Sequence, residues 1–365
     1  MYRKGLTLLL LAALGFSLEF TADLAAAAEV APQWEKVQEA AKKEGQLVLA
    51  ANPGTQEVFA EFQKKYPEIK VVAAPGRGEA SQILAERRAG KYLVDLSVHG
   101  MTTMSPLYKA KAFDPIKPTL MLPEVLDQSK WWGGKHLYKD EEKQYIFASD
   151  LTVLTSFAYN TKLVDPKEIK SYWDLLHPKW RGKILLVEPA SSGTGTSLQF
   201  LYHHSELGPE FIRRLLTEMD ITASRDTHQI VSWLATGKFA ISGLTLINRT
   251  GLNVAKKQGL PVDWFSPQQF KEGMALVSIG NNIGLMNRAP HPNAARVAIN
   301  WFLSREGQMI RQKPGNSDSL RIDIPKDDVA SHARRVEGAK YLLLDEQVDT
   351  APITKFVNEV WKRKN

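Results

Sequence analysis

Residues 183–197 read KILLVEPASSGTGTS, and the rest of the chain is interpreted outward from this stretch. Its first five residues are mainly apolar, which predicts a buried strand. Apolar residues then recur at helical spacing, so a helix is predicted to begin within the Gly-Thr-Gly turn. The start of a helix exposes unpaired backbone N–H groups and the positive end of the helix dipole. Glycines and hydroxyl side chains at such a turn indicate either a plain helix cap or a site for a carboxylate, phosphate or phosphonate.

The first 28 residues have the pattern of a secretory signal. Arg3 and Lys4 precede an apolar run at 6–14, and small residues lead up to Ala28. The run is too short for a membrane span, so we expect cleavage after about Ala28 and export of a soluble protein. The sequence has no cysteine, which excludes disulfides, thiolate metal ligands and a lipid anchor on cysteine. The expected location is therefore the periplasm, without a lipid anchor.

The length and net charge of the chain limit the number of lobes and the kinds of partner that can be expected. The chain has 365 residues, of which 44% are hydrophobic, enough for two lobes with separate cores. The formal net charge is +7, which suits an acidic ligand but also an ordinary solvated surface. Because the basic residues are scattered and the protein is expected to be exported, nucleic acid is not expected as a partner.

Strands and helices alternate in the first part of the chain. Strands are predicted at 47–51, 69–74 and 94–98, with helices between them, a pattern typical of a parallel sheet covered by helices. Ligands of such sheets bind beyond the carboxyl ends of the strands. The loops at those ends contain Asn52, Arg77 and His99, which we take as candidate ligand contacts.

A second α/β unit follows. Strands are predicted at 183–187, 221–224 and 239–243, again with intervening helices. Long β-rich runs are predicted at 151–159 and 274–280, and crossovers between two lobes are expected near 156–160 and near 272–279. Residues 105–145 are irregular in pattern, and the tail at 330–364 is predicted to be mainly helical. A cleft between two such lobes is the natural place for a ligand.

Several further segments carry a resemblance to a known family. They read AYNTKLV (158–164), WDLLHPKWRGKI (173–184), SGTG (192–195), LATGKFAI (234–241), HPNAA (291–295) and WFLSREGQ (301–308). In these segments the chain resembles the type II periplasmic solute-binding proteins of ABC transporters, in the branch that includes the ferric-ion-binding proteins. The matching segments together span nearly all of the chain after the signal.

The resemblance implies an α/β fold of two lobes, each a parallel-rich sheet flanked by helices, joined by crossover strands. Lobe 1 would comprise 29–155 and 272–316, and lobe 2 would comprise 156–271 and 317–365. The family's anion-contacting turn falls on residues 191–194, and its other contacts follow the next strands. With the strand-end residues of lobe 1, the candidate ligand-binding residues are Asn52, Arg77, His99, Ser191, Ser192, Gly193, Thr194, Gly195, Arg225, Ser242, Thr245 and Asn248.

The chain departs from the ferric-binding pattern at one point. Ferric-binding members hold iron with adjacent tyrosines after the strand that matches 239–243. This chain reads LTLINR at 244–249 and has no tyrosine between Tyr202 and Tyr341. Ferric iron is a hard cation that needs anionic oxygen ligands. We therefore expect no metal site and no cofactor.

The expected function is capture of a small anionic or polar organic solute, such as a phosphate ester, phosphonate or carboxylate. The expected partners are that solute and the ABC permease subunits of the inner membrane, and the protein is expected to act as a monomer. Two alternatives stay open. One is binding of ferric iron or an iron chelate, and the other is a secreted hydrolase or transferase that uses the same cleft. No nucleophile–base pairing favours the enzyme, so we expect binding without catalysis.

Overall fold

The computed structural model describes residues 32–74, 79–154, 156–191, 194–244, 249–278, 280–313, 318–345 and 347–362. They form two compact units, each described here by itself. Unit 1 comprises 32–149, 280–313 and 319–325, and unit 2 comprises 150–279, 318 and 326–362. The predicted signal at 1–28 lies outside the described residues. No helix in the described ranges is both long enough and apolar enough to cross a membrane.

Unit 1 is built on a six-stranded sheet in the order β2-β1-β3-β13-β4, with β5 pairing with β13. The strands are β1 (Gln46–Ala51), β2 (Lys70–Ala73), β3 (Leu96–His99), β4 (Phe113–Asp114), β5 (Phe147–Ala148) and β13 (Asn282–Met286). β1 pairs in parallel with both β2 and β3, whereas β13 runs antiparallel to β3. All of β3 and all but the first residue of β1 are buried, as their apolar runs predict.

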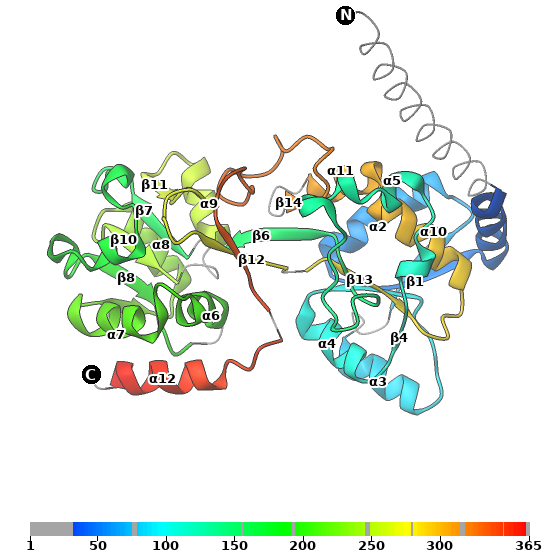
Figure 1. The fold of residues 1–365 in the computed structure, drawn as a ribbon, viewed down its shortest axis with the longest axis horizontal. Coiled ribbons are helices and arrows are strands. Elements are labelled where there is room, and N and C mark those ends of the chain that lie inside the picture. The colour runs from blue at the N-terminus through cyan, green and yellow to red at the C-terminus, as the bar shows by residue number, and fades with distance from the viewer. Residues whose placement is uncertain are drawn as a thin grey trace, which may run out of the picture. The chain divides into compact units, whose positions relative to one another are not determined.

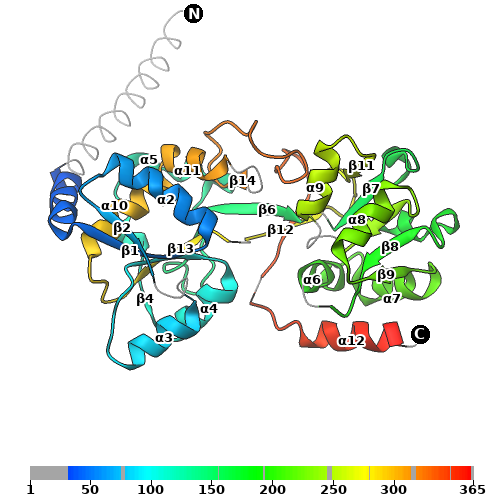
Figure 2. The ribbon, with the colours of Figure 1, turned by 180° about the vertical axis from the view of Figure 1, so that it is seen from behind.

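Helices cover both faces of this sheet (Figures 1 and 2). They are α2 (Pro53–Lys65), α3 (Ala80–Arg88), α4 (Met101–Lys109), α5 (Pro123–Leu126), α10 (Pro292–Leu303) and α11 (Arg305–Gln312). On one face Val48 and Ala50 pack with Met104 of α4 in a buried cluster. On the other side α2 packs on α10, where the ring centroids of Phe59 and Trp301 lie 5.9 Å apart. Alternate residues of a strand face opposite sides, which explains why both layers are needed.

Unit 2 contains a five-stranded sheet in the order β11-β7-β10-β8-β9. The strands are β7 (Phe157–Asn160), β8 (Ile184–Val187), β9 (Thr222–Ser224), β10 (Ile241–Gly243) and β11 (Val262–Trp264). β8 is parallel to β9 and β10. β7 is antiparallel to β10 and to β11, so β11 runs in the same direction as β10. The carboxyl ends of β8, β9, β10 and β11 therefore lie at one edge of the sheet.

The helices of unit 2 also form two layers. They are α6 (Gly195–His203), α7 (Gly208–Glu218), α8 (Thr227–Ala235), α9 (Arg249–Lys257) and α12 (Ala351–Lys362). Ala158 of β7 packs in a cluster with α8 and α9. Its neighbour Phe157 faces Tyr172, which in turn contacts Phe200 of α6 and Phe211 of α7 at 5.7 and 6.1 Å between ring centroids. The five-stranded sheet thus lies between these two layers.

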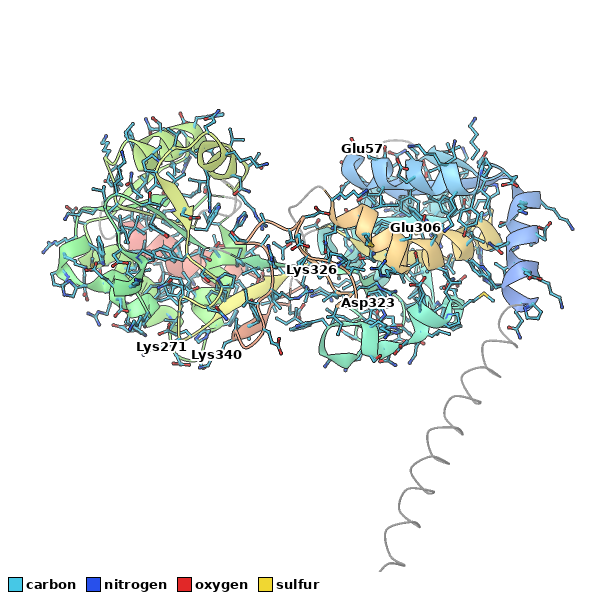
Figure 3. All side chains as sticks on the ribbon, turned by 90° about the horizontal axis from the view of Figure 1, so that it is seen from above. Glu57, Lys271, Glu306, Asp323, Lys326 and Lys340 are labelled. Carbon is cyan, nitrogen blue, oxygen red and sulfur yellow. The ribbon has the colours of Figure 1, made fainter. Side chains whose placement is uncertain are left out.

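A third sheet has the order β14-β6-β12-β15. Its strands are β6 (Asp150–Leu154), β12 (Met274–Val277), β14 (Asp318–Ser319) and β15 (Tyr341–Leu343). β12 is antiparallel to β6 and parallel to β15. The backbone N–H of Met274 donates to Lys340 O, 3.1 Å away, at the start of the β12–β15 pair. Figure 3 labels Lys340 and the neighbouring Lys271 at this point.

Single-turn 3-10 helices fill the connections in both units. They are η2 (Lys117–Thr119), η3 (Gln128–Lys130), η4 (Trp132–Gly134), η5 (Pro166–Glu168), η6 (Tyr172–Leu176) and η7 (Pro178–Trp180). The predicted short helix at Tyr172 is η6, which begins with a capping box between Ser171 and Asp174.

Three predictions of secondary structure were wrong. The β-rich run at 151–159 is not one strand, because β6 and β7 belong to different sheets. The run at 274–280 likewise ends as β12, and β13 lies in the sheet of unit 1. In the described part of the tail only α12 is helical, and residues 341–343 form β15.

The segment thought to be irregular from residue 105 also contains the second half of α4. That helix buries Met101, Met104 and Leu107 along one side despite Pro106. Tertiary packing of an apolar face outweighs the low helix propensity of proline here.

Candidate functional site

In unit 1, polar residues gather at the carboxyl edge of the parallel strands. A cavity of about 610 Å³ lies there. Its polar lining comprises Asn52, Glu79, Ser81, His99, Thr102 and Thr103. Asn52 follows β1 and His99 ends β3, and the parallel pairing of these strands brings the two residues to the same edge. The structure therefore places two of the three candidates of unit 1 on one cavity.

Three helices begin at this cavity. α2, α3 and α4 have Asn52, Glu79 and Gly100 as N-cap residues, and none of these three residues caps its helix with a side-chain hydrogen bond. Each helix start presents backbone N–H donors and the positive end of a dipole. The edge therefore offers donors suited to an oxyanion.

His99 is held in place by its neighbours. Its Nδ1 lies 3.1 Å from the hydroxyl of Ser97, and its carbonyl accepts a hydrogen bond of 3.0 Å from the Asn282 side chain. The Ser–His pair resembles a nucleophile and base, but Ser97 is completely buried. A nucleophile must reach its substrate, so Ser97 is suited to fixing the histidine ring and not to attack.

The unit 2 turn between β8 and α6 uses its hydroxyls internally. Ser191 Oγ donates to Glu188 O at 2.7 Å, and Thr194 Oγ1 donates to Pro189 O and Ser191 O at 3.0 and 2.9 Å. Thr194, the N-cap residue of α6, does not cap the helix with its side chain. A β-carbon at Gly195 would meet no atom within 4 Å, so the helix start is open at that point. Among the described residues of this turn, the donors left for a ligand are therefore backbone N–H groups of α6.

The remaining described candidates lie at different depths. Arg225 is exposed between Ser224, which ends β9, and Asp226, which caps α8. Ser242 lies within β10 and is fully buried, and its hydroxyl has no hydrogen-bond partner among the described residues. The candidates Arg77, Ser192, Gly193, Thr245 and Asn248 lie outside the described residues.

The structure also gathers polar residues that the sequence analysis did not select. Arg249 Nε donates to His332 Nε2 at 3.3 Å, and His332 stacks on Trp264 with ring centroids 5.3 Å apart. Arg249 begins α9, a few residues after β10, and Trp264 ends β11, so both lie at the carboxyl edge of the five-stranded sheet. Proximity to the end of β10 could have drawn attention to Arg249. His332 is 83 positions away, and no local pattern indicates the contact.

A family model matches residues 49–309, and its family is described as bacterial extracellular solute-binding protein. The matched range covers more than half of the chain. The chain belongs to this family. Its members are binding proteins, which agrees with the predicted resemblance.

This solute-binding protein has curated relatives of related kind. A Salmonella typhimurium protein, named as a 2-aminoethylphosphonate-binding periplasmic protein, is 27% identical over 201 residues. The match covers 53% of this chain and 55% of the relative. The chain thus spans about half the length of the curated relatives it matches.

Solved structures show the same fold. An extracellular solute-binding protein from Bordetella parapertussis matches with a TM-score of 0.60 and 15% identity, covering 88% of this chain and 98% of that one. A ferric binding protein from Campylobacter jejuni matches with a TM-score of 0.54 and 14% identity, covering 87% and 98%. At such identities the likeness shows the fold alone. The predicted fold class, the two-lobed type II binding-protein fold, is confirmed.

Within the described ranges, no group of three or more histidine, aspartate or glutamate side chains is arranged to hold a metal ion.

Proposed function

We propose that the protein captures a small anionic or polar organic solute in the periplasm and delivers it to the permease of an ABC import system. The solute class is a phosphate ester, phosphonate or carboxylate. The observation that carries the proposal is the cavity of unit 1, where three helices without side-chain caps begin around Asn52 and His99. Backbone N–H groups at helix starts bind oxyanions without needing a basic side chain.

The charge of this cavity suggests a more specific solute. Among the described residues that line the cavity, Glu79 is the one with a charged side chain, and it forms no ion pair within the described ranges. A carboxylate next to oxyanion donors suits a solute that carries both an acidic group and an ammonium group. 2-Aminoethylphosphonate, the compound in the name of the Salmonella typhimurium relative, is such a molecule.

The proposed setting follows the family. The protein would be exported by its N-terminal segment, act as a monomer without a lipid anchor, and bind its solute without chemical turnover. The buried position of Ser97 supports binding over hydrolysis, because the Ser–His pair cannot present its hydroxyl to a substrate.

Thermal unfolding of the purified protein with a panel of solutes tests the proposal. The panel comprises 2-aminoethylphosphonate, glycerol 3-phosphate, citrate, inorganic phosphate and uncharged glucose. A ligand at 100 times its Kd adds about 2.7 kcal/mol to the free energy of unfolding, enough to raise Tm by several degrees. We expect at least one organic oxyanion to raise Tm and glucose to leave it unchanged. Absence of any response to the acids, or release of products from the esters, would contradict the proposal.

A further inference from the structure

The Arg249 side chain in unit 2 is a part-buried cation for which the described residues supply no counter-ion. Its Nη2 is buried and has no hydrogen-bond partner among the residues that the structure describes. In the described ranges no carboxylate forms an ion pair with it, because Asp263 on the neighbouring strand pairs with Lys256 instead. Burial lowers the pKa of Arg249 to about 10, so the side chain is still charged at neutral pH. A charge taken out of water is costly unless it is paired. The described residues supply no anion for this guanidinium, so its partner has to be another group.

Neighbouring residues hold the guanidinium in a fixed position. His332 Nε2 accepts from Arg249 Nε, which requires a neutral imidazole with its proton on Nδ1. The His332 ring stacks on Trp264 at an interplanar angle of 25°, and Trp264 Nε1 donates to Asn253 Oδ1 at 2.9 Å. His332 and Trp264 are 6% and 5% exposed. The segment that carries His332 lies beside α9 in both ribbon views (Figures 1 and 2).

The local field is positive. Burial, Arg249 and Lys256, in that order, lower the pKa of His332 to about 3. The imidazole is therefore neutral at pH 7 and does not compensate the charge of Arg249. A guanidinium presents N–H donors in a rigid planar fork that matches the geometry of carboxylate and phosphonate oxygens. Arg249 is therefore suited to bind an anion that the described residues do not provide.

We propose that Arg249, positioned by His332 and Trp264, is the receptor in unit 2 for the oxyanion group of the solute. This inference rests on the proposed function and adds to it the residue that neutralises the acidic group. The ligand chemistry is a tetrahedral or planar oxyanion on a small organic molecule. Free inorganic phosphate shares that chemistry, so the test has to separate the two sources.

The test compares the full chain with Arg249→Met, using 2-aminoethylphosphonate and inorganic phosphate as separate probes. In the ligand-free protein, Arg249→Met is expected to keep or raise Tm, because it removes an unpaired, part-buried charge. A purely structural arginine would lower Tm on removal. We expect the variant to bind 2-aminoethylphosphonate at least about 30-fold more weakly by calorimetry, the loss of two charge-assisted hydrogen bonds.

Two further variants complete the test. Arg249→Lys keeps the charge but loses the fork, and it is expected to weaken binding about 10-fold, which keeps the test decisive if the methionine variant does not fold. Lys257→Met removes an exposed charge from the other end of α9 and is expected to bind as the wild type does.

The outcomes separate the two proposals. If the wild type binds 2-aminoethylphosphonate and the Arg249 variants bind it equally well, the inference is wrong and the proposed function stands. If the wild type responds to none of the oxyanions of the panel, both are wrong. Inorganic phosphate could also bind as tightly as 2-aminoethylphosphonate and depend equally on Arg249. That result would support Arg249 as the oxyanion receptor and would show that the organic part of the solute is not recognised.

Discussion

His332 shows how one buried residue makes stability depend on pH. Its pKa is lowered from 6.5 to about 3, first by burial and then by Arg249 and Lys256. Between these two values the unfolded chain binds a proton that the native chain does not bind, so stability falls as the pH falls. The free energy of unfolding should drop by about 2 kcal/mol from pH 7 to pH 5 on this account.

His332→Gln should remove this dependence, because glutamine can still accept from Arg249 but does not titrate. Urea unfolding at pH 7 and pH 5 measures the difference. His228→Gln, at an exposed position of α8, is the matched control and should keep the wild-type dependence. An equal loss of stability in wild type and His332→Gln would show that His332 is not its source.

Glu79 tests whether the solute carries an ammonium group. Glu79 lines the cavity of unit 1, and a carboxylate there favours a cationic amine. Glu79→Gln should weaken binding of 2-aminoethylphosphonate by about 1 kcal/mol, roughly a factor of 5, because the site is partly wet. Calorimetry should show no loss for methylphosphonate, which lacks the amine. Glu57→Gln, an exposed position on α2 labelled in Figure 3, is the control. A parallel loss for both phosphonates would exclude ammonium recognition by Glu79.

At the residue scale, the sequence is enough to select residues at the ends of strands, but it does not show contacts between residues far apart in the chain. Asn52 and His99 could be selected because parallel strands end at a common edge, and the structure brings them to one cavity. Their contact with a ligand stays a prediction. Arg249 and His332 could not be selected as a pair, since their contact depends on the return of the chain to unit 2. The internal hydrogen bonds of Ser191 and Thr194 were likewise invisible, because a turn sequence does not show where hydroxyls point.

At the scale of elements, helices and strands were largely predictable, whereas sheet membership was not. The apolar run at 151–159 gives one continuous β signal, but β6 and β7 pair with different partners. Periodicity reports burial of a segment, not the identity of the strand beside it. For the same reason β15 could not be predicted, because its three residues form a strand by pairing with β12.

Gly273 marks the place where the C-terminal segment joins the third sheet. It has a φ of +86°, and a β-carbon there would lie 2.4 Å from the carbonyl oxygen of Lys340. Both the backbone conformation and the contact disfavour any side chain. Gly273→Ala should therefore lower the free energy of unfolding by roughly 2–3 kcal/mol.

Gly259→Ala separates the backbone strain at Gly273 from the contact of its added β-carbon with Lys340. Gly259 has a φ of +80° but no atom within 4 Å of its β-carbon position, so it reports the backbone strain alone, roughly 1 kcal/mol. Urea unfolding of both variants measures the difference. Equal losses would show that the contact with Lys340 adds nothing.

At the scale of the whole molecule, a fold shared with a ferric binding protein does not bring the ligands that ferric iron needs. The metal requires anionic oxygen donors. Burial is the main cause that raises the pKa of Tyr159, Tyr172 and Tyr341, which disfavours phenolate at these positions. At the edge where β10 ends, the first described side chain of α9 is the cation Arg249. A positive charge repels Fe³⁺ and attracts an oxyanion.

We therefore expect the protein not to bind ferric iron. Titration with ferric citrate should give no visible charge-transfer band, because that band needs a tyrosinate–iron bond. Citrate alone has to be titrated in parallel, since Arg249 could bind its carboxylates and produce heat without iron. A coloured one-to-one complex that survives removal of citrate would show that the prediction is wrong. The same heat with and without iron would assign the binding to the oxyanion.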